Sequence, residues 1–194
     1  MFIDPIPEAE ATGAVAEIYA DDRQRWGYLP NFTKVFSHHP DAYRGWLQLI
    51  TAIRNDMDLR RCELATLAAS RTLRSSPCTV THGKILRDRF FDVETLSRIA
   101  VDHHHADLDA LDVAVMDFAD QATQQPTSVT REDVDVLKSL GLSDRDVLDV
   151  VLAVAARCFV VTVVEALGIS PDPEVTDALE PELLEALLEW DPVS

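Results

Sequence analysis

The chain has 194 residues, of which 47% are hydrophobic and 26% are charged, so its composition is that of a soluble globular protein with a sizeable core. Its formal net charge of -17 argues against binding to nucleic acid or to an anionic membrane surface, since both require basic surfaces. Its 3 cysteines are too few for a disulfide scaffold and fit a reducing compartment.

Apolar residues recur at spacings of three and four along most of the chain, and no alternating strand pattern interrupts them, so we expect an all-α fold. Proline at first helical positions and Ser, Thr or Asp at N-caps mark where helices begin. In chain order, the expected helices begin at Pro7, Phe32 and Pro40, after Asp58, Ser76 and Asp92, near Leu108, after Thr130 and Ser143, and at Glu182.

The most apolar stretch runs from Val147 to Ala166, and we expect it to form one long helix that ends at Gly168. Asp149, Arg157 and Glu165 interrupt it and argue against a membrane span. A helix that is apolar on all sides is expected to be buried, and a subunit interface is one place for that. The beginning of the chain lacks the basic and apolar segments of a signal peptide, so the expected location is the cytoplasm.

Residues 1–169 are expected to form one helical domain, with residues 170–194 as a linker and a final helix of the same unit. That final helix is a candidate for docking on a neighbouring subunit. Leu59–Glu63 resembles Leu142–Asp146, 83 residues later, which suggests two pseudo-repeated helical halves with two helices each.

Cys78 and His82 are four residues apart and therefore share one face of the expected helix. Ser76 and Pro77 predict that Cys78 lies in its first turn, where free N–H groups and the helix dipole stabilise a thiolate. Glu63, on the preceding helix, is placed to orient His82, and together they would form a nucleophile, a base and an orienting group. The alternative is that Cys78 is a small hydrophobic residue of the core.

We expect neither a metal nor a cofactor. Cys, His and Glu are zinc ligands, but Cys78, His82 and Glu63 lack a fourth ligand at a suitable spacing. The run from His103 to His105 falls in a connection between helices, and we interpret it as a solvated turn.

The pattern formed by Glu63, Ser75, Cys78 and His82 resembles the redox motif of the alkylhydroperoxidase D and carboxymuconolactone decarboxylase family. That motif is a Glu followed by Cys-x-x-Cys-x-x-x-His, and here Ser75 stands at the first cysteine. Further segments resemble the peroxidase-related branch of the family in the same order: Gly27-Tyr28-Leu29-Pro30-Asn31-Phe32, Lys34-Val35-Phe36, His39-Pro40, Ala106-Asp107-Leu108, Asp117-Phe118-Ala119, Val129-Thr130-Arg131-Glu132-Asp133-Val134, Gly141-Leu142-Ser143-Asp144 and Ala166-Leu167-Gly168.

The resemblance implies an all-α fold that assembles into homo-oligomers, commonly trimers or hexamers. In redox members of the family, the glutamate and histidine help to deprotonate the cysteine nearer the histidine, and these positions are Glu63, His82 and Cys78 here. The thiolate attacks a peroxide and becomes a sulfenate. The first cysteine then closes a disulfide, which a dithiol partner reduces.

Ser75 cannot form that disulfide, so a sulfenate at Cys78 would need another thiol. The candidates are Cys62, Cys158 and a small cellular thiol, although plain core packing is the preferred interpretation of Cys62 and Cys158. The Asn-Arg pair of the family is also absent, and Val161-Thr162 occupies its place.

Three functions follow as hypotheses. The first is a peroxidase-like antioxidant enzyme that uses Cys78 as its one catalytic cysteine, with a small-molecule peroxide and a thiol reductant as partners. The second is a cofactor-free lyase or isomerase resembling carboxymuconolactone decarboxylase, in which Glu63 and His82 transfer protons on a small carboxylic acid held by Arg71 or Arg74. The third is a non-catalytic member of the family.

Overall fold

The computed structural model describes residues 1–190, except the side chain of residue 56, and contains helices and no strands in that range, which confirms the all-α prediction. The α-helices are α1 Gly13–Trp26, α2 Asn31–Val35, α3 Pro40–Asp56, α4 Leu59–Thr72, α5 Ser76–Arg89, α6 Val93–Val101, α7 Ala110–Gln124, α8 Arg131–Ser139, α9 Asp144–Ala166, α10 Pro173–Thr176 and α11 Pro181–Leu188. Short 3-10 helices are η1 Glu8–Glu10, η2 Phe36–His38, η3 His103–His105 and η4 Pro126–Ser128.

Four of the expected N-caps are present with their side-chain hydrogen bonds. The carboxylates of Asp58 and Asp92 and the hydroxyls of Thr130 and Ser143 each accept from the backbone N–H three residues later. Each such cap contributes on the order of 1 kcal/mol to helix stability. Local sequence therefore sets the beginnings of α4, α6, α8 and α9.

Two boundaries differ from the prediction. The helix expected from Pro7 is broken, because Thr12 is extended and Gly13 has a φ of 52°, so α1 begins only at Gly13. The residue that precedes α5 is Ser75, not Ser76, since the Ser75 carbonyl accepts the first helical hydrogen bond from the Thr79 N–H at 2.9 Å.

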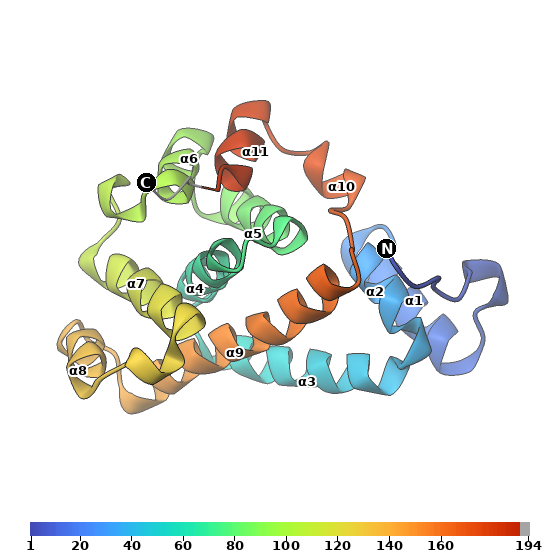
Figure 1. Cartoon of the computed structure of the whole chain (residues 1–194), viewed down its shortest axis with the longest axis horizontal. Helices are drawn as coiled ribbons and strands as arrows, with labels where there is room; N and C mark the ends of the chain where they lie inside the picture. Colours follow the sequence, from blue (N-terminus) through green and yellow to red (C-terminus); the bar gives the residue numbers. More distant parts are fainter. Residues whose placement is uncertain (191–194) are drawn as a thin grey trace.

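The core is built around α4, whose residues from Cys62 to Ser70 are all buried. This helix lies at the centre of Figure 1 and packs against α5, α7 and α9. On one side α3 runs along α9, and on the other α11 covers α5 and α6 (Figure 1). Helix α1 packs against α2 and α3, and the Phe32 ring of α2 contacts the rings of Tyr43 and Trp46 in α3.

Helix α9 has 23 residues and is long and apolar enough to cross a membrane, with a mean hydropathy of 2.4 over 18 residues. In this fold 56% of that window is buried, against α3, α4 and α7, as in a core helix. If the chain were two repeated halves offset by 83 residues, the turn between α4 and α5 would recur at residues 156–158. Helix α9 is continuous there. The short sequence match therefore does not extend to a repeated pair of helices.

The final helix α11 docks within its own chain, against α5 and α6, where Leu183, Ala186 and Leu187 are buried. Its docking on a neighbouring subunit stays a prediction. Gly83 of α5 makes this approach feasible, because a Cβ there would lie 2.5 Å from a methyl group of Leu187. Arg71 also holds α11, by donating to the carbonyl oxygens of Ala186 and Leu187 at 3.1 and 2.6 Å.

Candidate active site

The turn between α4 and α5 brings the two halves of the candidate motif together. Arg74 adopts the left-handed conformation, with a φ of 55°, and the Ser75 N–H donates to the Ser70 carbonyl at 2.9 Å. This conformation is strained for a residue with a Cβ, and it reverses the chain so that α5 packs back along α4. The result places His82 of α5 beside Glu63 of α4.

Glu63 is almost completely buried, at 1% exposure, and both of its carboxylate oxygens are engaged. Oε2 lies 2.5 Å from Nδ1 of His82, and Oε1 lies 2.5 Å from Nη2 of Arg54 on α3. The sequence pattern predicted that Glu63 lies beside His82, and the structure places the two side chains in contact. Arg54 belongs to no sequence motif, and its place beside Glu63 was not predicted from the sequence.

Burial opposes ionisation of Glu63, but His82, Arg54 and Arg157 together hold its pKa below the usual range. Burial also disfavours the charged form of His82, and the positive charge of Arg157 adds to this, so the pKa of His82 falls to about 4. At neutral pH the pair therefore consists of a carboxylate and a neutral imidazole. Because a carboxylate can only accept, the imidazole proton lies on Nδ1, and Nε2 keeps its lone pair.

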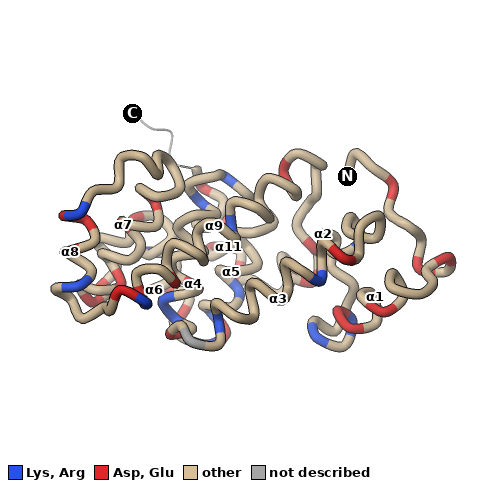
Figure 2. The backbone as a smooth tube through the Cα atoms, turned by 90° about the horizontal axis from the view of Figure 1, so that it is seen from below, with Lys and Arg blue, Asp and Glu red and all other residues tan. Residues whose placement is uncertain are grey.

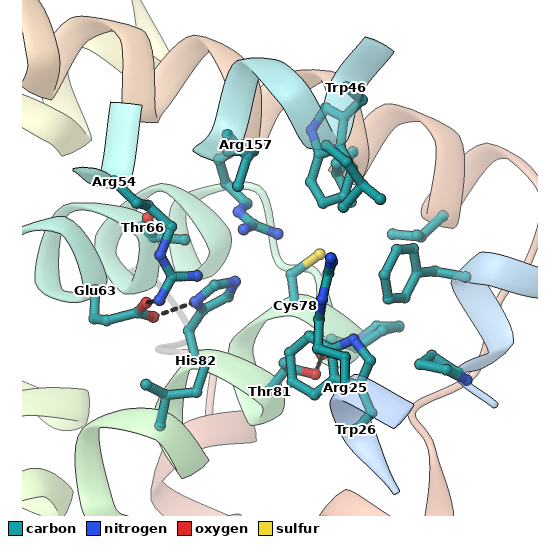
Figure 3. Close-up of a pocket in the computed structure, with 18 of the residues that line it drawn as sticks. Arg25, Trp26, Trp46, Arg54, Glu63, Thr66, Cys78, Thr81, His82 and Arg157 are labelled. Atoms are coloured by element: carbon teal, nitrogen blue, oxygen red, sulfur yellow. Dashed lines mark hydrogen bonds and ion pairs between the residues drawn. The ribbon is translucent and has the colours of Figure 1, made fainter. Parts of the chain in front are cut away.

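Cys78 and His82 face the same cavity, which has a volume of about 380 Å³ (Figure 3). Cys78 is in the first turn of α5, as predicted, and is 5% exposed. Besides these two residues, the lining includes charged side chains, a second cysteine and a set of aromatic side chains: Arg25, Arg54, Glu63, Arg157, Asp172, Cys62, Trp26, Tyr28, Phe32, Tyr43 and Trp46. A thiol, a base with a free lone pair and space for a small organic molecule therefore meet in one place.

Ser75 does not line this cavity. It is fully buried, and its hydroxyl donates to Oε1 of Glu165 at 2.6 Å. All three cysteines are free. Cys62 lines the cavity, but burial and the neighbouring Glu63 carboxylate raise the pKa of its thiol to about 11, and burial also raises the pKa of Cys158.

The arginines that lie at the site are not the ones expected from the sequence. Arg71 is committed to α11, and neither Arg71 nor Arg74 lines the cavity, so the expectation that they bind a carboxylate there is wrong. The arginines that do line it are Arg25, Arg54 and Arg157. Arg157 had a signal in the sequence, because it is one of the three charges that interrupt the apolar run of α9.

Among the described residues, His103, His104 and Asp117 form a group of metal-ligand type, with ligand atoms within 4.8 Å of one another. The group lies outside the cavity of Cys78. Nε2 of His103 is 2.7 Å from Asp117 Oδ1, and Nδ1 of His104 is 3.1 Å from Asp102 Oδ1. Hydrogen bonds to these two aspartates hold the histidines in the helical turn η3.

No protein-family model matches the chain, and neither does any curated protein. Among solved structures, an uncharacterized peroxidase-related protein from Ralstonia eutropha, described as an alkylhydroperoxidase AhpD core, is 23% identical, with a TM-score of 0.80 over 88% of this chain and 92% of that one. An uncharacterized peroxidase-related protein from a Silicibacter species is 20% identical, with a TM-score of 0.78 over 90% and 91% of the two chains. The debrominase Bmp8, in complex with 2,3,4-tribromopyrrole, is 15% identical, with a TM-score of 0.75 over 98% of both chains. The chain therefore has the helical fold of the alkylhydroperoxidase D-like, peroxidase-related proteins.

Proposed function

We propose that this chain is a thiol peroxidase that reduces small organic hydroperoxides with Cys78 as its one catalytic cysteine. The observation that carries the proposal is the 2.5 Å contact between Glu63 and His82 beside a cavity that Cys78 also lines. Cys78 also lies in the first turn of α5, where backbone N–H groups have no partner within the helix. The third hypothesis, a non-catalytic protein, does not explain why Glu63, His82 and Cys78 lie together.

The first step is attack of the Cys78 sulfur on the terminal oxygen of the hydroperoxide. The oxygen–oxygen bond breaks, the hydroxyl group stays on sulfur as a sulfenic acid, and the alkoxide leaves as an alcohol. The proton of the thiol passes to Nε2 of His82 and from there to the leaving oxygen. The pKa of about 4 keeps Nε2 of His82 unprotonated at neutral pH and makes it a weak base, so the proton does not stay on the imidazole and moves on to the leaving oxygen.

The second step restores the thiol without a disulfide to position 75. A small monothiol attacks the sulfenic acid, which releases water, and a second monothiol then releases Cys78 as the symmetrical disulfide leaves. Cys62 is a poor alternative, since its raised pKa keeps it protonated. The cavity admits small organic molecules by its volume, which supports access for an external thiol.

The test is consumption of cumene hydroperoxide with glutathione as reductant. Wild type is compared with Cys78→Ser and, as a matched control, with Cys158→Ser, which makes the same chemical change outside the cavity. We expect loss of activity only in Cys78→Ser. Equal rates in wild type and Cys78→Ser would remove the proposal.

A second candidate is a cofactor-free lyase or isomerase in which Glu63 and His82 transfer protons on a small carboxylic acid. The cavity arginines favour it, because they offer partners for a carboxylate. Exchange of carbon-bound hydrogen in D₂O over a panel of such acids would detect the activity. It should survive Cys78→Ala and be lost in His82→Ala; loss in both variants would count against it.

The same proposal includes a cytoplasmic homo-oligomer, a trimer or a hexamer. Helix α9 exposes three large apolar side chains, Leu148 at 53%, Val151 at 38% and Phe159 at 45%. Figure 2 shows few charged residues along the middle of this helix. Light scattering coupled to size exclusion should give a multiple of 21.6 kDa, and a mass of one chain would contradict this part.

A further inference from the structure

The guanidinium of Arg157 stands out because it is buried without a counter-ion. The residue is 7% exposed, its Nε has no hydrogen-bond partner, and no carboxylate of the described residues lies within 4.0 Å of its nitrogens. In Figure 3 it points from α9 into the space beside Cys78 and His82. A buried, unpaired cation is costly to the fold, so its retention calls for a partner.

The carboxylates that line the cavity are already engaged. Glu63 uses one oxygen for Arg54 and the other for His82. Asp172 accepts from the Asn31 N–H at 2.8 Å and from the hydroxyl of Tyr28. Neither of these carboxylates forms an ion pair with Arg157, although the whole chain has a formal net charge of -17.

The rest of the lining provides aromatic surface. Trp26 and Trp46 have buried indole N–H groups without a partner, and Tyr28, Phe32 and Tyr43 complete the aromatic part. Aromatic walls suit a flat ligand. A volume of about 380 Å³ is within the range of small-molecule sites.

We infer that the cavity binds a planar organic carboxylate, whose two oxygens accept hydrogen bonds from Arg157 while its flat part lies against the tryptophans. A guanidinium and a carboxylate form two parallel hydrogen bonds, which fixes orientation as well as affinity. The inference names the substrate class of the site and rests on the proposed peroxidase for what happens next: the substrate is an organic hydroperoxide that also carries a carboxylate. Binding itself does not require the thiol.

The test is calorimetric titration of the full chain with benzoate and with benzamide, its neutral counterpart of the same shape. Protein carrying Cys78→Ser is included, so that binding is measured apart from thiol chemistry. We expect benzoate to bind about 10- to 100-fold more tightly than benzamide in both proteins, the range for hydrogen bonds to a charged group. Arg157→Met should abolish the preference and leave benzamide binding within about threefold.

Arg89→Met is the matched control, because it removes the same charge from an exposed position of α5 outside the cavity and should keep the preference. Arg157→Lys keeps the charge without the planar fork and should retain part of the preference, which provides a second reading if Arg157→Met does not fold. Equal binding of the two probes, no binding of benzoate, or a preference that survives loss of the Arg157 charge would each overturn the inference. Selective benzoate binding without peroxide consumption would instead reject the peroxidase and leave the anion site standing.

Discussion

Replacing Ser75 by cysteine restores the two-thiol spacing that the chain lacks. In the wild type, the Ser75 hydroxyl donates to Glu165 at 2.6 Å, and a thiol is a much weaker donor. Loss of this bond should lower the free energy of unfolding by about 1–3 kcal/mol. Side chains three residues apart at a helix have Cβ atoms about 5–6 Å apart. A disulfide needs about 3.5–4.5 Å, so the first turn of α5 must close by roughly 1–2 Å.

Intact-mass measurement after one equivalent of peroxide distinguishes the two chemistries. Wild type should gain one oxygen atom, as a sulfenic acid at Cys78. Ser75→Cys should instead lose two hydrogen atoms and two titratable thiols, because a neighbouring thiol acts at a high effective concentration. Its turnover should then depend on a dithiol reductant and no longer on a monothiol.

Ser75→Ala is the control, since it loses the same hydrogen bond without adding a thiol. It should match Ser75→Cys in stability and the wild type in its oxidation product. A persistent sulfenic acid at Cys78 in Ser75→Cys would refute the reasoning that position 75 is where a resolving thiol belongs in this fold.

Three other predictions concern the charge of the site and the packing around it. The pKa of His82 is about 4 in the fold against 6.5 in the unfolded chain, so on acidification the unfolded state binds the proton first, and stability is lost as the pH is lowered from about 6.5 to about 4. Between pH 7 and pH 5 His82 should account for about 2 kcal/mol of lost stability, which His82→Gln removes, as urea unfolding would measure. Arg157→Met should raise the pKa of His82 by about one unit or more in an NMR titration, because a nearby positive charge is removed. Gly83→Val should cost about 1–3 kcal/mol through its clash with Leu187, and less in a Leu187→Ala background.

For each of these three predictions, one result would contradict the reasoning. The same pH dependence in wild type and His82→Gln would show that the imidazole is not held neutral by burial. An unchanged His82 pKa in Arg157→Met would place the guanidinium too far away to act on it. Strict additivity of Gly83→Val and Leu187→Ala would mean that α11 does not rest on α5 at this point.

Features that depend on local sequence were predicted well. The caps at Asp58 and Ser143 act within three residues, and the pairing of Cys78 with His82 follows from the helical period alone. The helix expected from Pro7 is wrong because Ala11 and Thr12 are extended, so the chain leaves the helical conformation after Glu10 and α1 begins only at Gly13. Such a choice depends on packing beyond the neighbouring residues.

Contacts between distant segments were harder to predict. Arg54 reaches Glu63 from α3, and Arg157 reaches the cavity from α9, and no spacing rule links these residues to the motif. Arg71 was expected to bind a carboxylic acid because the sequence does not predict that α11 docks on α5 and α6, where Arg71 donates hydrogen bonds to α11. The one sequence feature that indicates Arg157 is its position as a charged residue inside the most apolar helix.

The most direct test of Cys78 as the reactive thiol is trapping of its sulfenic acid. The protein is treated with one equivalent of cumene hydroperoxide in the presence of dimedone, and the adduct is located by peptide mass spectrometry. We predict one adduct, on Cys78, that is lost in Cys78→Ser and strongly reduced in His82→Gln. An adduct on Cys62 or Cys158, or one on Cys78 that forms equally well without His82, would contradict the proposed mechanism.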